Sequence, residues 1–212
     1  NNPSDTTNKL LTIASTANSF GPANNSESGD LQDRLDARHS DNTLTIQNGT
    51  IAGSVYGAYT KKVNTPTSNN TVTINGGTVN GATLGGHSWS EATDNKIIVN
   101  NGTPRGIQGG VAEHGKANNN SVTINGGTVE HGITGDRGVF EANNNHIIIN
   151  GGTVDGRLTG GFSYGGNAHY NTIEVRGGVV TGYIMGGYNF SSGGNPSSAS
   201  MMTVSPPPQS SC

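Results

Sequence analysis

The stretch NNNSVTINGGTV, residues 118–129, occurs in closely similar form twice more in this chain. Residues 69–79 read NNTVTINGGTV, and residues 144–154 read NNHIIINGGTV. The asparagine that precedes each apolar triplet serves below as the reference asparagine of its unit. Six units then begin at Asn42, Asn70, Asn95, Asn120, Asn145 and Asn171, at intervals of 28, 25, 25, 25 and 26 residues. A fixed period of this length indicates a stack of similar structural units.

Apolar residues recur at three places in each unit. Positions two and four after the reference asparagine are apolar in every copy, as in Val122 and Ile124, and the residue between them is mostly polar. This alternation of β-branched residues predicts a short strand. A second apolar position follows at Ile51, Val79, Pro104, Val129, Val154 and Val180, and a third at Val55, Leu84, Ile107, Ile133, Leu158 and Ile184. We therefore expect three short strands per unit, each with its apolar side chains facing inward.

Glycine and asparagine separate these segments. One glycine lies seven residues after each reference asparagine, at Gly49, Gly77, Gly102, Gly127, Gly152 and Gly178. A second series occupies Gly57, Gly85, Gly110, Gly135, Gly160 and Gly186. Glycine adopts the positive φ that a sharp corner needs. We also expect Asn75, Asn100, Asn125 and Asn150 to form an amide ladder along one corner, which stops at Arg176.

The pattern predicts an all-β parallel β-helix (a β-solenoid) with about 25 residues per turn and six or more turns. Single units cannot bury an apolar face, but stacked units share one core. Residues 1–41 are expected to form an N-terminal cap, with a degenerate first turn at 10–13 and an amphipathic segment at 29–41. The repeats span 42–194, and residues 195–212 are expected to form a last turn and a linker tail.

Composition excludes several classes of function. The chain has 34 Gly, 28 Asn, only 30% hydrophobic residues and a formal charge of −3. So small a charge, without a basic cluster, argues against nucleic-acid binding. No apolar run is long enough for a transmembrane helix, and the one cysteine, Cys212, excludes an intramolecular disulfide.

Between the second glycine and the next reference asparagine, the units differ from one another, and most aromatic residues lie there. These candidate binding residues are Tyr59, Trp89, Phe140, Phe162, Tyr164, Tyr170, Tyr188 and Phe190. Loops on a rigid scaffold commonly carry binding functions. Two interpretations are open: the rings cover the loop-side edge of the solenoid, or they form a surface that binds glycans or a host protein.

Three charged residues occupy one position of successive units: Arg105, Glu130 and Asp155. Stacking would bring the two carboxylates close enough to act as a glycosidase pair, or the three could be solvated surface charges. The histidines do not share a position in the repeat, so neither a metal site nor a cofactor is expected.

The units NNTVTINGGTVNGATLGG, NNSVTINGGTVEHGITG and NNHIIINGGTVDGRLTGG resemble the Asn/Gly-rich repeats of autotransporter passenger domains from Gram-negative bacteria. The resemblance covers residues 42–194. It implies a right-handed, pectin-lyase-like parallel β-helix that is exported through a C-terminal β-barrel translocator outside this chain and displayed on the cell surface. The clustered aspartates and basic residues of the pectin-degrading relatives have no match here.

We therefore expect a non-enzymatic cell-surface segment, an adhesin or rigid stalk, whose partner is a host or bacterial surface protein or a glycan. One alternative is a polysaccharide lyase or hydrolase acting through Arg105, Glu130 and Asp155. Another is a self-associating, fibre-forming surface protein.

Overall fold

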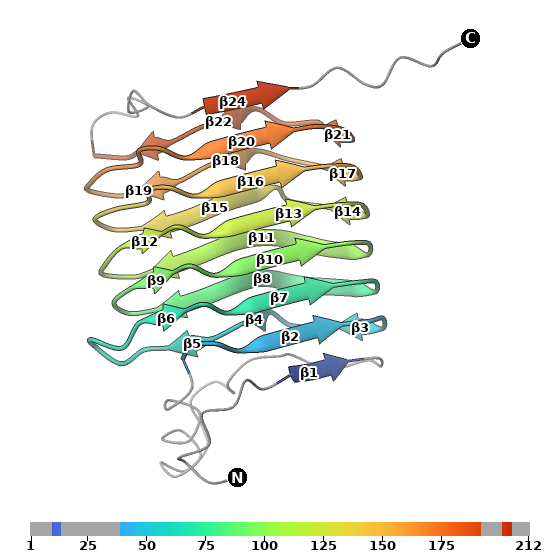
Figure 1. The fold of residues 1–212 in the computed structure, drawn as a ribbon, viewed down its shortest axis with the longest axis horizontal. Helices are drawn as coiled ribbons and strands as arrows, with labels where there is room; N and C mark the ends of the chain where they lie inside the picture. The colour runs from blue at the N-terminus through green and yellow to red at the C-terminus, as the bar shows by residue number, and fades with distance from the viewer. Residues whose placement is uncertain (1–9, 14–38, 192–200, 205–212) are drawn as a thin grey trace, which may run out of the picture.

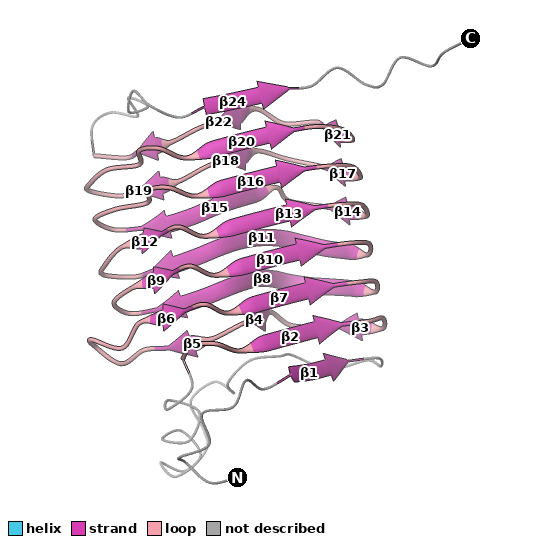
Figure 2. Ribbon diagram, in the orientation of Figure 1, coloured by secondary structure: helices cyan, strands magenta, loops and turns pink. Residues whose placement is uncertain are grey.

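The computed structural model describes residues 10–13, 39–191 and 201–204, and it confirms the predicted fold class (Figure 1). The chain forms a parallel β-solenoid of about six turns, with strands stacked about 25 residues apart. Every regular element among the described residues is a strand, as the single strand colour of Figure 2 shows. The expected amphipathic segment at 29–41 lies almost entirely outside the described residues.

The first strand of every turn contributes to one eight-stranded parallel sheet. Its strands, in spatial order, are β1 (Leu10–Ile13), β2 (Thr43–Ile46), β7 (Thr71–Ile74), β10 (Lys96–Val99), β13 (Ser121–Ile124), β16 (His146–Ile149), β20 (Thr172–Val175) and β24 (Met201–Val204). Equivalent residues of successive turns pair directly, for example Val122 with Ile97 on one side and with Ile147 on the other. The sequence period therefore fixes the register.

The other predicted strands form two further parallel sheets. The larger contains β3 (Thr50–Ile51), β4 (Val55–Tyr56), β5 (Tyr59–Thr60), β8 (Thr78–Ser88), β11 (Thr103–Ala112), β15 (Ile133–Gly138), β18 (Leu158–Thr159), β19 (Phe162–Ser163), β22 (Ile184–Met185) and β23 (Tyr188–Asn189). The smaller contains β14 (Thr128–Val129), β17 (Thr153–Val154) and β21 (Val179–Val180).

A fourth set of strands was not predicted. It consists of β6 (Thr67–Ser68), β9 (Ala92–Thr93) and β12 (Ala117–Asn118), inside the segment that the sequence suggested was an irregular loop. A small residue three positions before each reference asparagine from Asn70 onward is fully buried there: Thr67, Ala92, Ala117, Ala142 and Ala168. That series of small residues was the available sequence signal.

The main core is a column of aliphatic side chains from the three predicted sheets, and Ala92, Ala112 and Ala117 form a separate small cluster beside the fourth set of strands. The largest fully buried members of the main core include Ile46, Ile74, Ile124 and Ile149. One predicted core position is wrong. Val55 and Ile107 pair with Thr83, so Thr83 takes the inward place and Leu84 lies outside the main core cluster. A one-residue shift moves a strand side chain to the opposite face.

The two glycine series serve different purposes. Every glycine of the first series has a positive φ, between 81° and 104°, as a left-handed corner requires. The second series does not have a positive φ. A Cβ on Gly135 would lie 2.2 Å from the carbonyl oxygen of Gly160 in the next turn, so these glycines are needed for close stacking. The third member is Gly109, not Gly110, because an irregularity between Pro104 and Gly106 shortens that turn.

Candidate functional site

A buried amide ladder holds the loop side of the solenoid in place. The reference asparagines from Asn70 onward are fully buried. Most donate a side-chain amide hydrogen to the next, as in Asn70 Nδ2 to Asn95 Oδ1 at 2.8 Å and Asn95 Nδ2 to Asn120 Oδ1 at 3.0 Å, but Asn120 does not donate to Asn145 in this way. The backbone N–H of each donates to the same oxygen. The sequence pattern identified these asparagines only as the start of each unit and did not predict the hydrogen bonds between them.

The exposed ladder predicted at the opposite corner is confirmed. Asn100 donates to Asn75 at 2.8 Å, Asn125 to Asn100 at 2.7 Å, and Asn150 to Asn125 at 2.8 Å. Gln47 continues it in the first turn by accepting a hydrogen bond from Asn75. Each bond joins adjacent turns, so this corner is clamped along its length.

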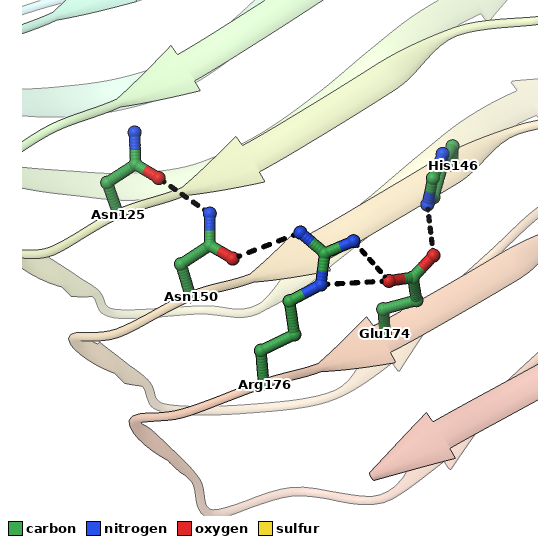
Figure 3. A network of polar contacts seen from close by, with 5 residues as sticks. All are labelled: Asn125, His146, Asn150, Glu174 and Arg176. Atoms are coloured by element: carbon green, nitrogen blue, oxygen red, sulfur yellow. Dashed lines mark hydrogen bonds and ion pairs between the residues drawn. The ribbon is translucent and has the colours of Figure 1, made fainter. Parts of the chain in front are cut away.

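At its last rung the amide series ends at Arg176, as expected, and a charged network replaces it (Figure 3). Arg176 Nη1 donates to Asn150 Oδ1 at 3.5 Å, while its Nε donates to Glu174 Oε2 at 2.9 Å. The other Glu174 oxygen lies 3.1 Å from His146 Nε2. The hydrogen bonds from Arg176 lower the pKa of Glu174, with a smaller contribution from His146. This exposed network ties the fifth turn to the sixth.

The main candidate site is a surface strip on the side of the solenoid where β5 and β19 lie in Figure 1. We call it the aromatic strip, and it consists of Tyr59, His87, Glu113, Arg137, Phe162, Tyr164, Tyr188 and Phe190. Its strand positions alternate with buried residues such as Ser88 and Ser163, so its side chains point outward. It thus presents one or two side chains from each of the six turns.

Contacts link the aromatic strip from end to end. In its first half the Tyr59 and His87 rings meet edge to face at 4.9 Å, and His87 Nε2 lies 2.9 Å from Glu113 Oε1. Glu113 then pairs with Arg137, whose Nη2 is 3.7 Å away. These contacts join the first four turns.

The second half of the aromatic strip is a cluster of rings. The Arg137 guanidinium lies 5.7 Å from the centroid of the Tyr164 ring, within the range of a cation–π contact. Phe162 stacks on Tyr188 at 5.2 Å and 18° and meets Tyr164 edge to face at 4.9 Å. Tyr164 in turn lies 6.3 Å from Phe190.

The surroundings of His87, the histidine of the aromatic strip, favour its neutral form. Burial lowers the pKa of His87, although the hydrogen bond and charge of Glu113 oppose that effect. Because Nε2 faces a carboxylate, it carries the proton, and Nδ1 is left as an acceptor. In the described part of the chain, buried Nδ1 has no hydrogen-bond partner. The imidazole therefore packs mainly as a ring against Tyr59 and Tyr56.

Three predicted aromatic residues lie outside the aromatic strip. Trp89 packs against His114 with ring centroids 3.9 Å apart, and Trp89 is 38% exposed. Phe140 is 57% exposed. Tyr170 is 63% exposed and has a φ of 55°, a left-handed conformation that costs a bulky residue free energy. Its equivalents, also at positive φ, are Asp41, Asn69, Asp94, Asn119 and Asn144.

The charged residues proposed for the glycan-cleaving alternative lie on the far corner. The pairing of β14 with β17 brings Glu130 beside Asp155 in adjacent turns, and both are exposed. Asp155 Oδ1 accepts a hydrogen bond from the Thr181 hydroxyl at 2.6 Å. Arg105 is directed to the Asn80 carbonyl at 3.5 Å, and none of the described ion pairs joins Arg105 to either carboxylate.

The sequence did not identify His87, Glu113 and Arg137 as members of the site. A signal was present, because His87 and Arg137 occupy the position of the unit that holds Tyr59, Phe162 and Tyr188. A search for aromatic residues alone could not find it.

Two negative findings concern only residues 10–13, 39–191 and 201–204. They contain no cluster of three or more His, Cys, Asp or Glu side chains that could hold a metal ion. They also form no helix suited to crossing a membrane.

The chain matches no protein-family model, no curated protein sequence and no solved structure.

Proposed function

We propose that this chain is a non-enzymatic binding segment of a cell-surface protein, and that the aromatic strip is its contact surface. The supporting observation is the continuity of the aromatic strip, which connects rings and charged groups from all six turns. Stacking and two amide ladders hold these groups in fixed positions. A preordered surface loses little conformational entropy on binding.

The chemistry of the aromatic strip suits a protein surface or a glycan. Tyr164 and Phe190 are 41% and 62% exposed, so their rings are available to a partner. Aromatic side chains are the usual anchors of binding surfaces because they bury much area at low entropic cost. Glu113 and Arg137 supply an acceptor and several donors beside the rings.

A binding screen tests this proposal. The purified chain, labelled at one site, is applied to glycan arrays and to bacterial and epithelial cells. Replacing both Tyr164 and Phe190 by Ala should reduce binding at least tenfold. The matched control is Tyr183→Ala, because Tyr183 is 63% exposed but lies just before β22, away from the aromatic strip. Equal loss in both variants, or no binding to any surface, would refute the proposal.

We further propose that the chain is the passenger segment of an autotransporter adhesin or stalk of a Gram-negative bacterium. Support comes from the resemblance of its Asn/Gly-rich units and from the solenoid fold, which suits an elongated surface protein. The test is to express the complete reading frame in a Gram-negative host and to label intact cells with an antibody against the repeats. Labelling only after cell lysis would contradict display on the surface.

A further inference from the structure

One turn carries a buried acid at a position that the other turns fill with glycine or alanine. The residue is Asp136 in β15, and its equivalents are Ala58, Gly86, Gly110, Gly161 and Gly187. This position faces the buried amide ladder. A Cβ on Gly86 would lie 2.7 Å from Asn95 Nδ2, and one on Gly161 would lie 2.6 Å from Asn171 Nδ2. A side chain longer than a methyl group therefore crowds the ladder, whereas Ala58 leaves the rung from Asn42 to Asn70 intact at 2.8 Å.

Asp136 does displace a rung. Asn120 Nδ2 donates to Asp136 Oδ2 at 3.2 Å, whereas the other described rungs donate to the next reference asparagine. The second carboxyl oxygen accepts the backbone N–H of Arg137 at 2.7 Å, and the Asn145 side chain is also bonded to the carboxyl group. The side-chain ladder is thus interrupted between the turns that begin at Asn120 and Asn145.

No positive charge compensates the Asp136 carboxyl group among the described residues. The Arg137 guanidinium points outward to Glu113 and Tyr164. The groups that face Asp136 from neighbouring elements are the amides before β13 and β16, Gly110 of β11, and Gly161 before β19, and none of these titrates. His146, the closest histidine in sequence to Asn145, is directed to Glu174.

Burial opposes ionisation of this group. Asp136 is fully buried, and desolvation raises its pKa well above the ordinary value although three hydrogen bonds act in the other direction. An uncompensated buried carboxylate is costly, so the folded chain holds this proton to a higher pH than the unfolded chain does. The Asp136 carboxylate is solvated only when water reaches it, and this requires the two turns to separate locally.

We infer that Asp136 makes the joint between the turns beginning at Asn120 and Asn145 sensitive to protons. With the carboxyl group protonated, the stack is closed through this joint. With the carboxylate ionised, the joint opens, and Arg137 moves away from Glu113 and Tyr164. Ionisation would then divide the aromatic strip into two halves, a consequence for binding that rests on the proposed function.

The direction of the pH effect follows from linkage. An unfolded aspartate has a pKa of about 3.9, so between that value and the higher folded pKa of Asp136 only the folded state holds the proton. Stability is therefore greatest below the unfolded pKa and falls as the pH rises through the folded pKa. Within that window the closed state loses about tenfold in its equilibrium against the open state per pH unit.

Hydrogen exchange measured on the whole chain tests the inference. Protection factors, corrected for intrinsic exchange, are compared at pH 5 and pH 8 for the backbone amides of Asn120 and His146, which donate across the joint, and for that of Asn70 as an internal reference. We expect protection at the joint to fall at least about tenfold at pH 8, relative to Asn70. Asp136→Gly and Asp136→Asn should abolish this fall, and Asp155→Asn, which removes an exposed carboxylate, should not.

Two results would overturn the inference: no fall in the native chain, or the same fall in the Asp136 variants. If those variants do not fold, carbon-13 titration of the native side chains gives the answer, and a pKa of Asp136 no higher than that of Asp155 would overturn it. A pH-dependent joint in a chain that binds no surface would leave the inference standing and refute only the proposed function.

Discussion

The two amide ladders allow one chemical change to be compared in a buried and in an exposed setting. We predict that Asn95→Ala destabilises the solenoid strongly and that Asn100→Ala hardly affects it. Both side chains form amide–amide bonds to the turns on either side. Asn95 is fully buried, whereas Asn100 is exposed. Solvation is therefore the main difference between the two substitutions.

The magnitude follows from the bonds that each substitution removes. Asn95 Oδ1 accepts from Asn70 N at 3.1 Å and Asn70 Nδ2 at 2.8 Å, and Asn95 Nδ2 donates to the Asn120 side chain and to the Thr67 carbonyl. In Asn95→Ala the backbone N–H of Asn70 is buried without an acceptor. Such an orphaned group costs about 1–3 kcal/mol, and with the other lost bonds we expect a total of about 3–5 kcal/mol.

Water replaces the lost partners in Asn100→Ala. The side chains of Asn75 and Asn125 then bond to solvent, so the expected cost is about 0–1 kcal/mol. Both variants lose a similar volume of side chain. The comparison therefore isolates the desolvation of the amide.

Urea unfolding at pH 7 measures both costs. Fluorescence of Trp89, the only tryptophan, and far-ultraviolet circular dichroism should give coincident transitions before free energies are compared, because solenoids can unfold in parts. Equal destabilisation of the two variants, or a cost below about 1 kcal/mol for Asn95→Ala, would refute the argument that burial makes this ladder the stronger one.

Three further predictions concern individual positions. Tyr170→Asn should raise the free energy of unfolding by about 1 kcal/mol, because asparagine adopts this positive φ at lower cost than tyrosine. A decrease in thermal stability would contradict this. Gly135→Ala should destabilise the fold because the new Cβ would lie 2.2 Å from a carbonyl oxygen. In Gly106→Ala the nearest atom to the new Cβ is the His131 Cβ at 3.7 Å, an ordinary contact, so this variant should be near neutral in the same urea assay. His87→Phe should reduce the loss of stability between pH 7 and pH 5. Burial lowers the pKa of His87 in the folded chain. Below about pH 6.5 the unfolded chain therefore binds a proton at this histidine more readily than the folded chain does, so stability falls on acidification. An unchanged pH dependence of the melting temperature would show that His87 titrates normally.

The sequence by itself determined the period, the strand that follows each reference asparagine, and the glycine corner seven residues after it. These features depend on local chemistry: β-branched alternation, the positive φ of glycine, and repetition that brings identical residues together in adjacent turns. The exposed amide ladder could be predicted for the same reason, since one column of the repeat held only asparagine over four turns.

The tertiary structure alone decided which side chains face inward and which face one another. Thr83 replaced Leu84 in the core because register, and not hydrophobicity, sets the face of a strand residue. The reference asparagines became a buried ladder because the glycines behind them allow the turns to approach closely. The contacts of His87 with Glu113, and of Glu113 with Arg137, join residues about one turn apart in sequence. Their side-chain directions arise only when all turns are packed against one another.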